Sequence, residues 1–114
     1  MDLKTIKYFY IGLLKESELG LIEIEKKDTN YNRIEMGPGD LEFNEDVLIN
    51  MVEITFPQAK KCWGLLTHFG IWDSLNNGKL LTIGNLIQKR IIRKNDIAQF
   101  DINDIEISIE SIGI

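Results

Sequence analysis

The chain has 114 residues, of which 44% are hydrophobic and 27% charged, and its formal net charge is −5. This is an ordinary globular composition, and it excludes both a disordered chain and one that binds nucleic acid through a broad positive field. A single Cys excludes an internal disulfide and a CxxC metal site. We therefore expect one domain over residues 1–114 that needs no cofactor.

The N-terminal segment is expected to form the first strand. Its apolar run, residues 8–14, is too short to span a membrane and lacks a small-residue cleavage site. A helical stripe would also fit Leu3, Ile6, Tyr10, Leu13 and Leu14, but the aromatic and β-branched residues of KYFYI favour a strand. We predict a strand, with no secretion signal and no membrane partner.

Alternation of apolar and polar residues predicts further strands in chain order. Residues 19–24 form one such pattern and end in a polar turn. Residues 52–56 form another, which stops at Pro57 because proline cannot donate to a β-ladder. Residues 105–112 alternate in the same way, with isoleucines on one face.

Turn signals separate these segments. Asn77-Gly78 lies between the apolar runs at residues 64–72 and 79–87, and Asn-Gly is a strong hairpin signal. Residues 37–40, 94–96 and 101–104 are further turns. Short strands at such spacing predict an all-β antiparallel sandwich, jelly-roll-like, in a single domain.

Charged clusters are interpreted as solvated surface. Asp40, Glu42, Glu45 and Asp46 resemble loose Ca²⁺ ligands, but their spacing does not match an EF-hand, so we expect an acidic loop and no metal. The basic pairs at residues 60–61, 89–90 and 93–94 have no interleaved aromatic residues. Nucleic-acid binding needs several convergent cations, so we expect no such partner.

Residues 56–73 contain the only Cys, the only His and both Trp. Cys62 and His68 suggest a nucleophile and its base, but on an extended strand they lie about 20 Å apart. Asp73 follows the strand and is expected to accept backbone N–H groups in the turn. We therefore predict no catalytic residue.

The same stretch predicts two faces of a strand. Trp63, Leu65, Thr67, Phe69 and Ile71 are expected to face the core, and Gly64, Leu66, His68, Gly70 and Trp72 the opposite side. On that opposite side the glycines allow close approach of an aromatic ring or backbone. We expect His68 and Trp72 to contact a second sheet, with an intersubunit contact as the alternative.

The segments FPxA, WG, THFGIWD and LLxxGxL occupy residues 56–59, 63–64, 67–73 and 80–86. This pattern resembles small structural proteins of tailed-bacteriophage virions, with weaker similarity over residues 31–110. Segments 92–96 and 104–109 look like the closing hairpin of such proteins. The structural motif is carried by Phe56, Pro57, Trp63, Gly64, His68, Phe69, Gly70, Trp72, Asp73, Gly78 and Gly84.

The resemblance implies a non-enzymatic virion protein that assembles with copies of itself, as a trimer, or with other virion proteins. Tail or fibre attachment is the leading hypothesis, followed by capsid decoration or head-fibre anchoring. The alternative is a receptor- or carbohydrate-binding module, because sandwiches carry such sites on their loops. The predicted loops offer only Phe43 as an aromatic platform, which weighs against sugar binding.

Overall fold

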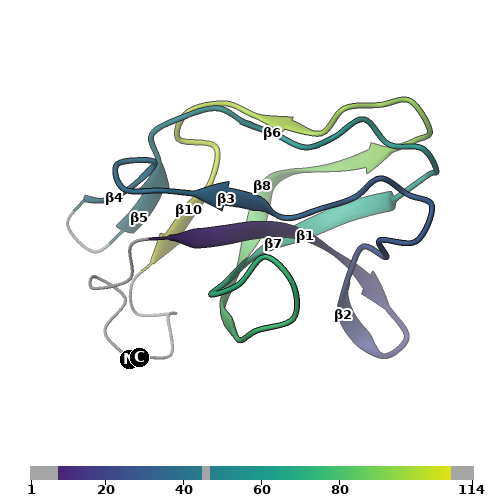
Figure 1. Ribbon diagram of the computed structural model, residues 1–114, viewed down its shortest axis with the longest axis horizontal. Helices are drawn as coiled ribbons and strands as arrows, with labels where there is room; N and C mark the ends of the chain where they lie inside the picture. Colours follow the sequence, from purple (N-terminus) through teal and green to yellow (C-terminus); the bar gives the residue numbers. More distant parts are fainter. Residues whose placement is uncertain (1–7, 45–46, 109–114) are drawn as a thin grey trace.

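The computed structural model describes residues 8–44 and 47–108, and these residues contain strands and no α-helix (Figure 1). The strands are β1 (Phe9–Ser17), β2 (Gly20–Glu23), β3 (Ile34–Met36), β4 (Leu41–Asn44), β5 (Val47–Asn50), β6 (Ile54–Thr55), β7 (Gly64–Trp72), β8 (Leu80–Ile92), β9 (Gln99–Phe100) and β10 (Glu106–Ser108). Within this described part of the chain, no helix could cross a bilayer.

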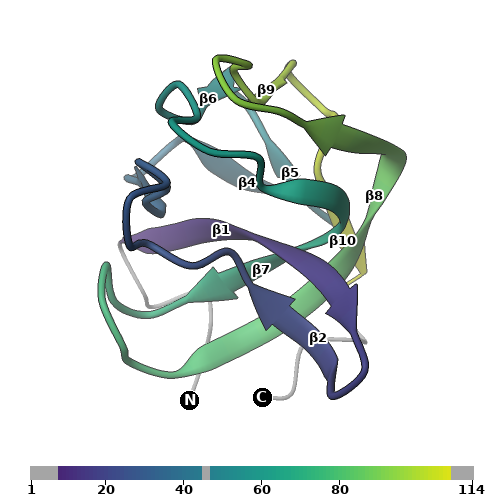
Figure 2. The ribbon, with the colours of Figure 1, turned by 90° about the vertical axis from the view of Figure 1, so that its right-hand side faces the viewer.

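The strands form antiparallel sheets in two layers. The main sheet has five strands in the order β2-β1-β7-β8, with β3 also paired to β1. A three-stranded sheet, β10-β5-β4, and a two-stranded sheet, β6-β9, lie on the other side of the core (Figure 2). The predicted all-β antiparallel sandwich is therefore confirmed.

Strand β1 shows why the N-terminal segment is extended. Phe9, Ile11 and Leu13 alternate into the core, and Ile11 and Leu13 are 0% exposed. The intervening Gly12 lies on the other face, opposite Gly70 of β7. The predicted strand is confirmed from Phe9 onward, whereas the earlier residues Leu3 and Ile6 lie outside the described residues.

Aromatic side chains join the two layers in the core. The ring of Tyr31 stacks on Phe56 at a centroid distance of 6.1 Å and meets the edge of Trp63 at 5.5 Å. Phe56 in turn packs edge-on against Phe100, at 6.1 Å. The buried indole of Trp63 donates from Nε1 to the carbonyl of Thr29 at 3.0 Å, so its polar group is satisfied.

The predicted faces of β7 are wrong at Leu65 and Leu66, whereas Trp63 and Thr67 are buried as predicted. Leu65 is 46% exposed and Leu66 is fully buried, the reverse of the prediction. The cause is a register shift: Leu66 lies opposite Arg90 but His68 lies opposite Asn85. Residues 86–89 of β8 therefore face a single residue of β7, and this bulge changes the side-chain alternation. Beyond the bulge, Phe69 and Ile71 face the core as predicted.

Three smaller predictions are also corrected. Leu19 lies in the turn that closes the β1–β2 hairpin, where Ser17 pairs with Gly20, and it is 95% exposed. Val52 is exposed because the strand is limited to Ile54–Thr55. Residues 92–96 and 104–109 form no hairpin with each other, since β10 pairs with β5 and β9 pairs with β6.

In the acidic segment, residues 37–44 are a turn followed by β4 rather than a loop. Asp40 closes the turn: its carboxylate accepts from Gly37 N–H at 2.8 Å, and its own N–H donates to the Gly37 carbonyl. Asp96 and Asp104 close two further turns with the same pair of bonds. These aspartates therefore serve as turn acceptors, while Glu45 and Asp46 lie outside the described residues.

Candidate functional site along strand β8

The predicted motif residues around Trp72 lie on the outer face of the main sheet. Gly12 and Gly70 are partners across β1 and β7, and a Cβ on either would come within 2.7 Å of the Trp72 ring. The guanidinium carbon of Arg33 lies 4.1 Å from the centre of that ring. The expected contact between Trp72 and a second sheet is therefore wrong, because Arg33 covers the ring and Trp72 lies outside the core cluster.

Arg33 is buried, and each of its three guanidinium nitrogens donates a hydrogen bond. Its Nε and Nη2 donate to the two carboxylate oxygens of Glu23, both at 2.9 Å. Its Nη1 donates to the carbonyls of Ser74 and Asn77, at 2.8 and 2.7 Å. One guanidinium thus ties β2 to the β7–β8 connection and leaves little freedom for an external ligand.

Tyr31 extends this network toward the core. Its hydroxyl donates to Glu23 at 2.5 Å and accepts from the backbone N–H of Leu13 at 3.0 Å. Burial raises the pKa of the Tyr31 phenol, and the hydrogen bond to Glu23 raises it further. The phenol therefore stays protonated and acts as a structural donor.

The candidates for catalysis are not brought together. Cys62 is exposed in the loop before β7, whereas the His68 ring nitrogen Nδ1 lies 2.7 Å from the neighbouring Thr67 hydroxyl within the strand. Asp73 accepts from Lys79 N–H at 2.7 Å, as predicted, and this bond lowers the pKa of Asp73. Among the described residues, no group of three or more His, Cys, Asp or Glu could hold a metal ion.

The remaining motif residues shape the backbone. Pro57 follows β6, and buried Phe56 sits before it in the core. Gly78 has a φ of 72°, which the β7–β8 turn requires. A Cβ on Gly84 would lie 2.5 Å from the Phe69 ring, so that glycine makes room for the ring. Gly64 opens β7.

Strand β8 lies at the edge of the main sheet and carries several exposed apolar side chains. Ile87 is 67% exposed, and four neighbours are each exposed by more than a third. We call these five residues the β8 row: Leu80, Ile83, Ile87 and Ile91 of β8, with Leu65, which pairs with Ile91. Within the described residues, no strand pairs with the second edge of β8. The row is therefore a candidate contact surface.

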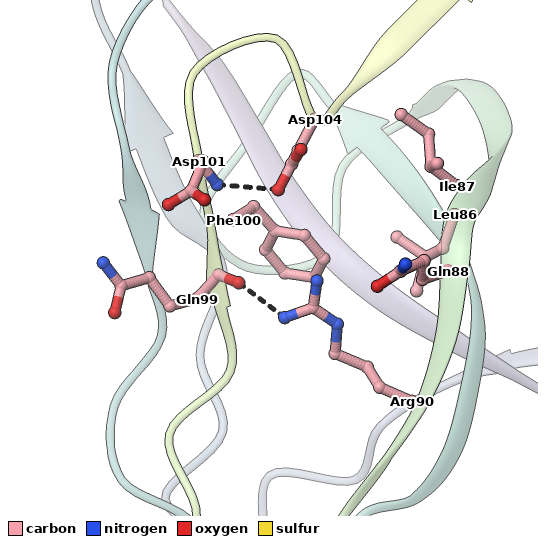
Figure 3. Close-up of a pocket in the computed structure, with 8 residues that line it drawn as sticks. All are labelled: Leu86, Ile87, Gln88, Arg90, Gln99, Phe100, Asp101 and Asp104. Atoms are coloured by element: carbon pink, nitrogen blue, oxygen red, sulfur yellow. Dashed lines mark hydrogen bonds between the residues drawn. The ribbon is translucent and has the colours of Figure 1, made fainter.

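A hollow of about 340 Å³ lies beside the row, between the β8 bulge and the turn after β9 (Figure 3). We call it the seam pocket, and it is lined by Leu86, Ile87, Gln88, Arg90, Gln99, Phe100, Asp101 and Asp104. Arg90 lies over the Phe100 ring, 4.5 Å from its centre, and donates to the carbonyl of Gln99 at 2.6 Å. The pocket thus has an apolar rim and polar walls.

Sequence reasoning missed both features. The isoleucines at 83, 87 and 91 recur every four residues, so a regular strand places all three on one face. This spacing could have identified the exposed apolar row, but it does not mark the bulge, which depends on pairing with β7. The pocket depends on contacts between β8 and the turn after β9. No local sequence pattern predicts these contacts.

The comparisons with known proteins decide the family. A family model described as "Podophage GP4 fiber I protein gp80" matches residues 20–108 of the chain. The chain belongs to this podophage fibre family. The matched range begins at β2 and ends with β10, so it contains the β8 row and the seam pocket. The comparison with curated proteins finds no match.

Membership of the podophage fibre family makes the chain a structural component located in the virion. The resemblance to tailed-phage virion proteins is thereby confirmed at the level of the family. The particular FPxA–WG–THFGIWD–LLxxGxL pattern and the role of its residues stay predictions.

Proposed function

We propose that this podophage fibre protein is a non-enzymatic subunit that associates laterally with copies of itself through the β8 row, as a trimer, and in that form attaches to other virion proteins. The observation that carries the proposal is Ile87, an aliphatic side chain left two-thirds exposed at the rim of a pocket. Such an anchor beside a hollow is typical of protein contacts. The number three rests on the resemblance to phage appendages. For the place in the virion, we favour attachment at the tail or fibre over capsid decoration or head-fibre anchoring.

The geometry supports side-chain contacts rather than edge-to-edge strand pairing. Residues 86–89 bulge out of register with β7, which bends the strand and interrupts a regular hydrogen-bonding edge. Exposed Lys89 lies within that bulge, and a lysine on an edge opposes strand addition. The β8 row therefore offers an apolar surface on a protected edge.

The experiment compares two surface variants by analytical ultracentrifugation. Ile87→Asp/Ile91→Asp places charges in the row, and Leu19→Asp places one on the distant β1–β2 turn, where Leu19 is 95% exposed. In 500 mM NaCl, wild type and Leu19→Asp are expected to sediment at three times the 13.1 kDa chain mass, and the row variant as a 13.1 kDa monomer with an unchanged circular dichroism spectrum. A monomeric wild type, or a row variant that stays oligomeric, would contradict lateral self-assembly.

Receptor or carbohydrate binding is the second candidate, and the polar walls of the seam pocket are what favours it. Sugars usually stack on an exposed aromatic face. Phe100 is only 2% exposed and is covered by Arg90, so its ring offers no such platform. Assembly therefore takes precedence.

A further inference from the structure

Three loops gather at one end of the molecule and carry an excess of positive charge. The backbone of residues 57–62 contacts the other two loops: Lys60 N–H donates to Thr29, at 3.0 Å, and Asn95 N–H donates to Ala59, at 2.7 Å. We call residues 25–31, 57–62 and 93–96 the basic end. Its charged residues are Lys26, Lys27, Lys60, Lys61, Arg93 and Lys94 against Glu25, Asp28 and Asp96, a formal surplus of three positive charges. Figure 2 faces this end, with the β1–β2 hairpin apart from the loops.

The opposite end is acidic and is organised by one buried residue. Asn50 is 0% exposed: its amide donates to the carbonyls of Val52 and Asp101 and accepts from Ile105 N–H. The N–H of Met51 donates to Asp40. We call residues 38–42, 50–53 and 101–106 the acidic end. It contains Asp40, Glu42, Glu53, Asp101, Asp104 and Glu106, and its sequence has no Lys or Arg.

The two ends are separate and opposite in sign. In Figure 1 the β4-β5-β10 sheet lies at one end of the longest axis and the three basic loops at the other, and the extent along that axis is 37 Å. This length is several times the screening distance of about 10 Å at 0.1 M salt, so each end presents its own field. Both ends also expose apolar side chains, Ile97 beside the basic loops and Val52 and Ile102 beside the acidic turns.

We infer that the basic end of one copy binds the acidic end of the next, so that copies of this chain stack head to tail. Opposite charges on two ends of the same chain make a heterologous contact. Such contacts build an open filament of copies when they do not close into a ring. The inference goes beyond the proposed function, since the β8 row joins copies side by side and the two ends would join them along an axis.

Charge reversal of each end tests this contact. Lys60→Glu/Lys61→Glu/Lys94→Glu gives a chain with two acidic ends, and Glu42→Lys/Glu53→Lys/Asp101→Lys/Glu106→Lys gives one with two basic ends. In 20 mM NaCl, each variant alone is expected to lose the concentration-dependent growth in sedimentation coefficient that the wild type shows. An equimolar mixture is expected to regain it, because unlike ends then meet. The apparent association constant of the wild type should fall about tenfold or more in 500 mM NaCl.

The control is Lys79→Glu, which makes the net charge more negative but touches neither end nor the side chains of the β8 row. It is expected to associate like the wild type, while thermal melts verify that every variant folds. A mixture that fails to associate, or wild-type growth that persists in 500 mM NaCl, would overturn the head-to-tail contact. A salt-resistant oligomer that Ile87→Asp/Ile91→Asp disrupts, found without any salt-sensitive growth of the wild type, would overturn it and still leave the lateral assembly standing.

Discussion

At the scale of single residues, Arg33 is the side chain on which the outer face of the main sheet depends. Arg33→Met removes four hydrogen bonds and leaves the Glu23 carboxylate, 21% exposed, without its cation. We expect a loss of about 2–4 kcal/mol in the free energy of unfolding, toward the lower part of the range for broken buried pairs, because Glu23 keeps some contact with water and the Tyr31 hydroxyl.

Urea denaturation measures this loss against a matched control. Arg93→Met removes an arginine that is exposed in the turn after β8, and it should change the free energy of unfolding by no more than about 0.5 kcal/mol. Arg33→Lys should fall between the two, since a single ammonium cannot reproduce the bidentate pair with Glu23. Equal stabilities for Arg33→Met and Arg93→Met would show that the network contributes nothing.

The sequence could predict some of these residues and not others. Asp73 was identifiable as a turn acceptor because an Asp after a strand and before Asn-Gly bonds nearby backbone N–H groups. The role of Arg33 could not be predicted, since its partners Glu23, Ser74 and Asn77 come from two distant segments. Burial of a cation is decided by such tertiary partners and leaves no local pattern.

At the scale of elements, the pairing of β1 with β7 depends on two facing glycines. Neither Gly12 nor Gly70 has a positive φ, so the backbone would accept alanine, but a Cβ on Gly70 would lie 2.7 Å from the Trp72 ring. Gly70→Ala should therefore destabilise the fold by about 1–3 kcal/mol through overpacking. Gly37→Ala is the control, because its nearest atom would be at 3.5 Å, an ordinary contact.

A double-mutant cycle, measured by chemical denaturation, verifies that the strain lies against Trp72. In a Trp72→Leu background the ring is absent, so the effect of Gly70→Ala should shrink markedly. Purely additive effects of Gly70→Ala and Trp72→Leu would place the strain elsewhere.

The strands and the turns between them could largely be predicted from the sequence, but the irregularity in their pairing could not. Aromatic and β-branched residues identified β1, and Asn77-Gly78 located the β7–β8 turn. The bulge at residues 86–89 was not predictable, because adjacent Leu65 and Leu66 fit either face of a strand equally well. Only pairing with β8 decides which leucine is buried.

At the scale of the whole molecule, the aromatic core predicts how the two layers unfold. Tyr31 packs with both Trp63 and Phe56, and Phe56, which follows β6, packs edge-on against Phe100 of β9, so one cluster links both layers. Composition and turn spacing led to an antiparallel sandwich because short alternating strands must bury one face each. They could not determine the order of strands in the sheets, which depends on pairings between distant segments such as β10 with β5.

We expect the chain to unfold as one cooperative unit, and Trp63→Ala tests this with two probes. The substitution removes a side chain that is 1% exposed, and should lower the free energy of unfolding by about 3–5 kcal/mol. It leaves Trp72 as the sole tryptophan, so fluorescence then reports the outer face of the main sheet while far-ultraviolet circular dichroism reports all strands. Both probes should give the same midpoint in guanidinium, because layers that share one core melt together.

Leu65→Ala, at a half-exposed site on the same strand, should shift that midpoint far less. If Trp72 fluorescence persisted after the dichroism had fallen, the main sheet would be stable without the smaller sheets, and the chain would not behave as one domain.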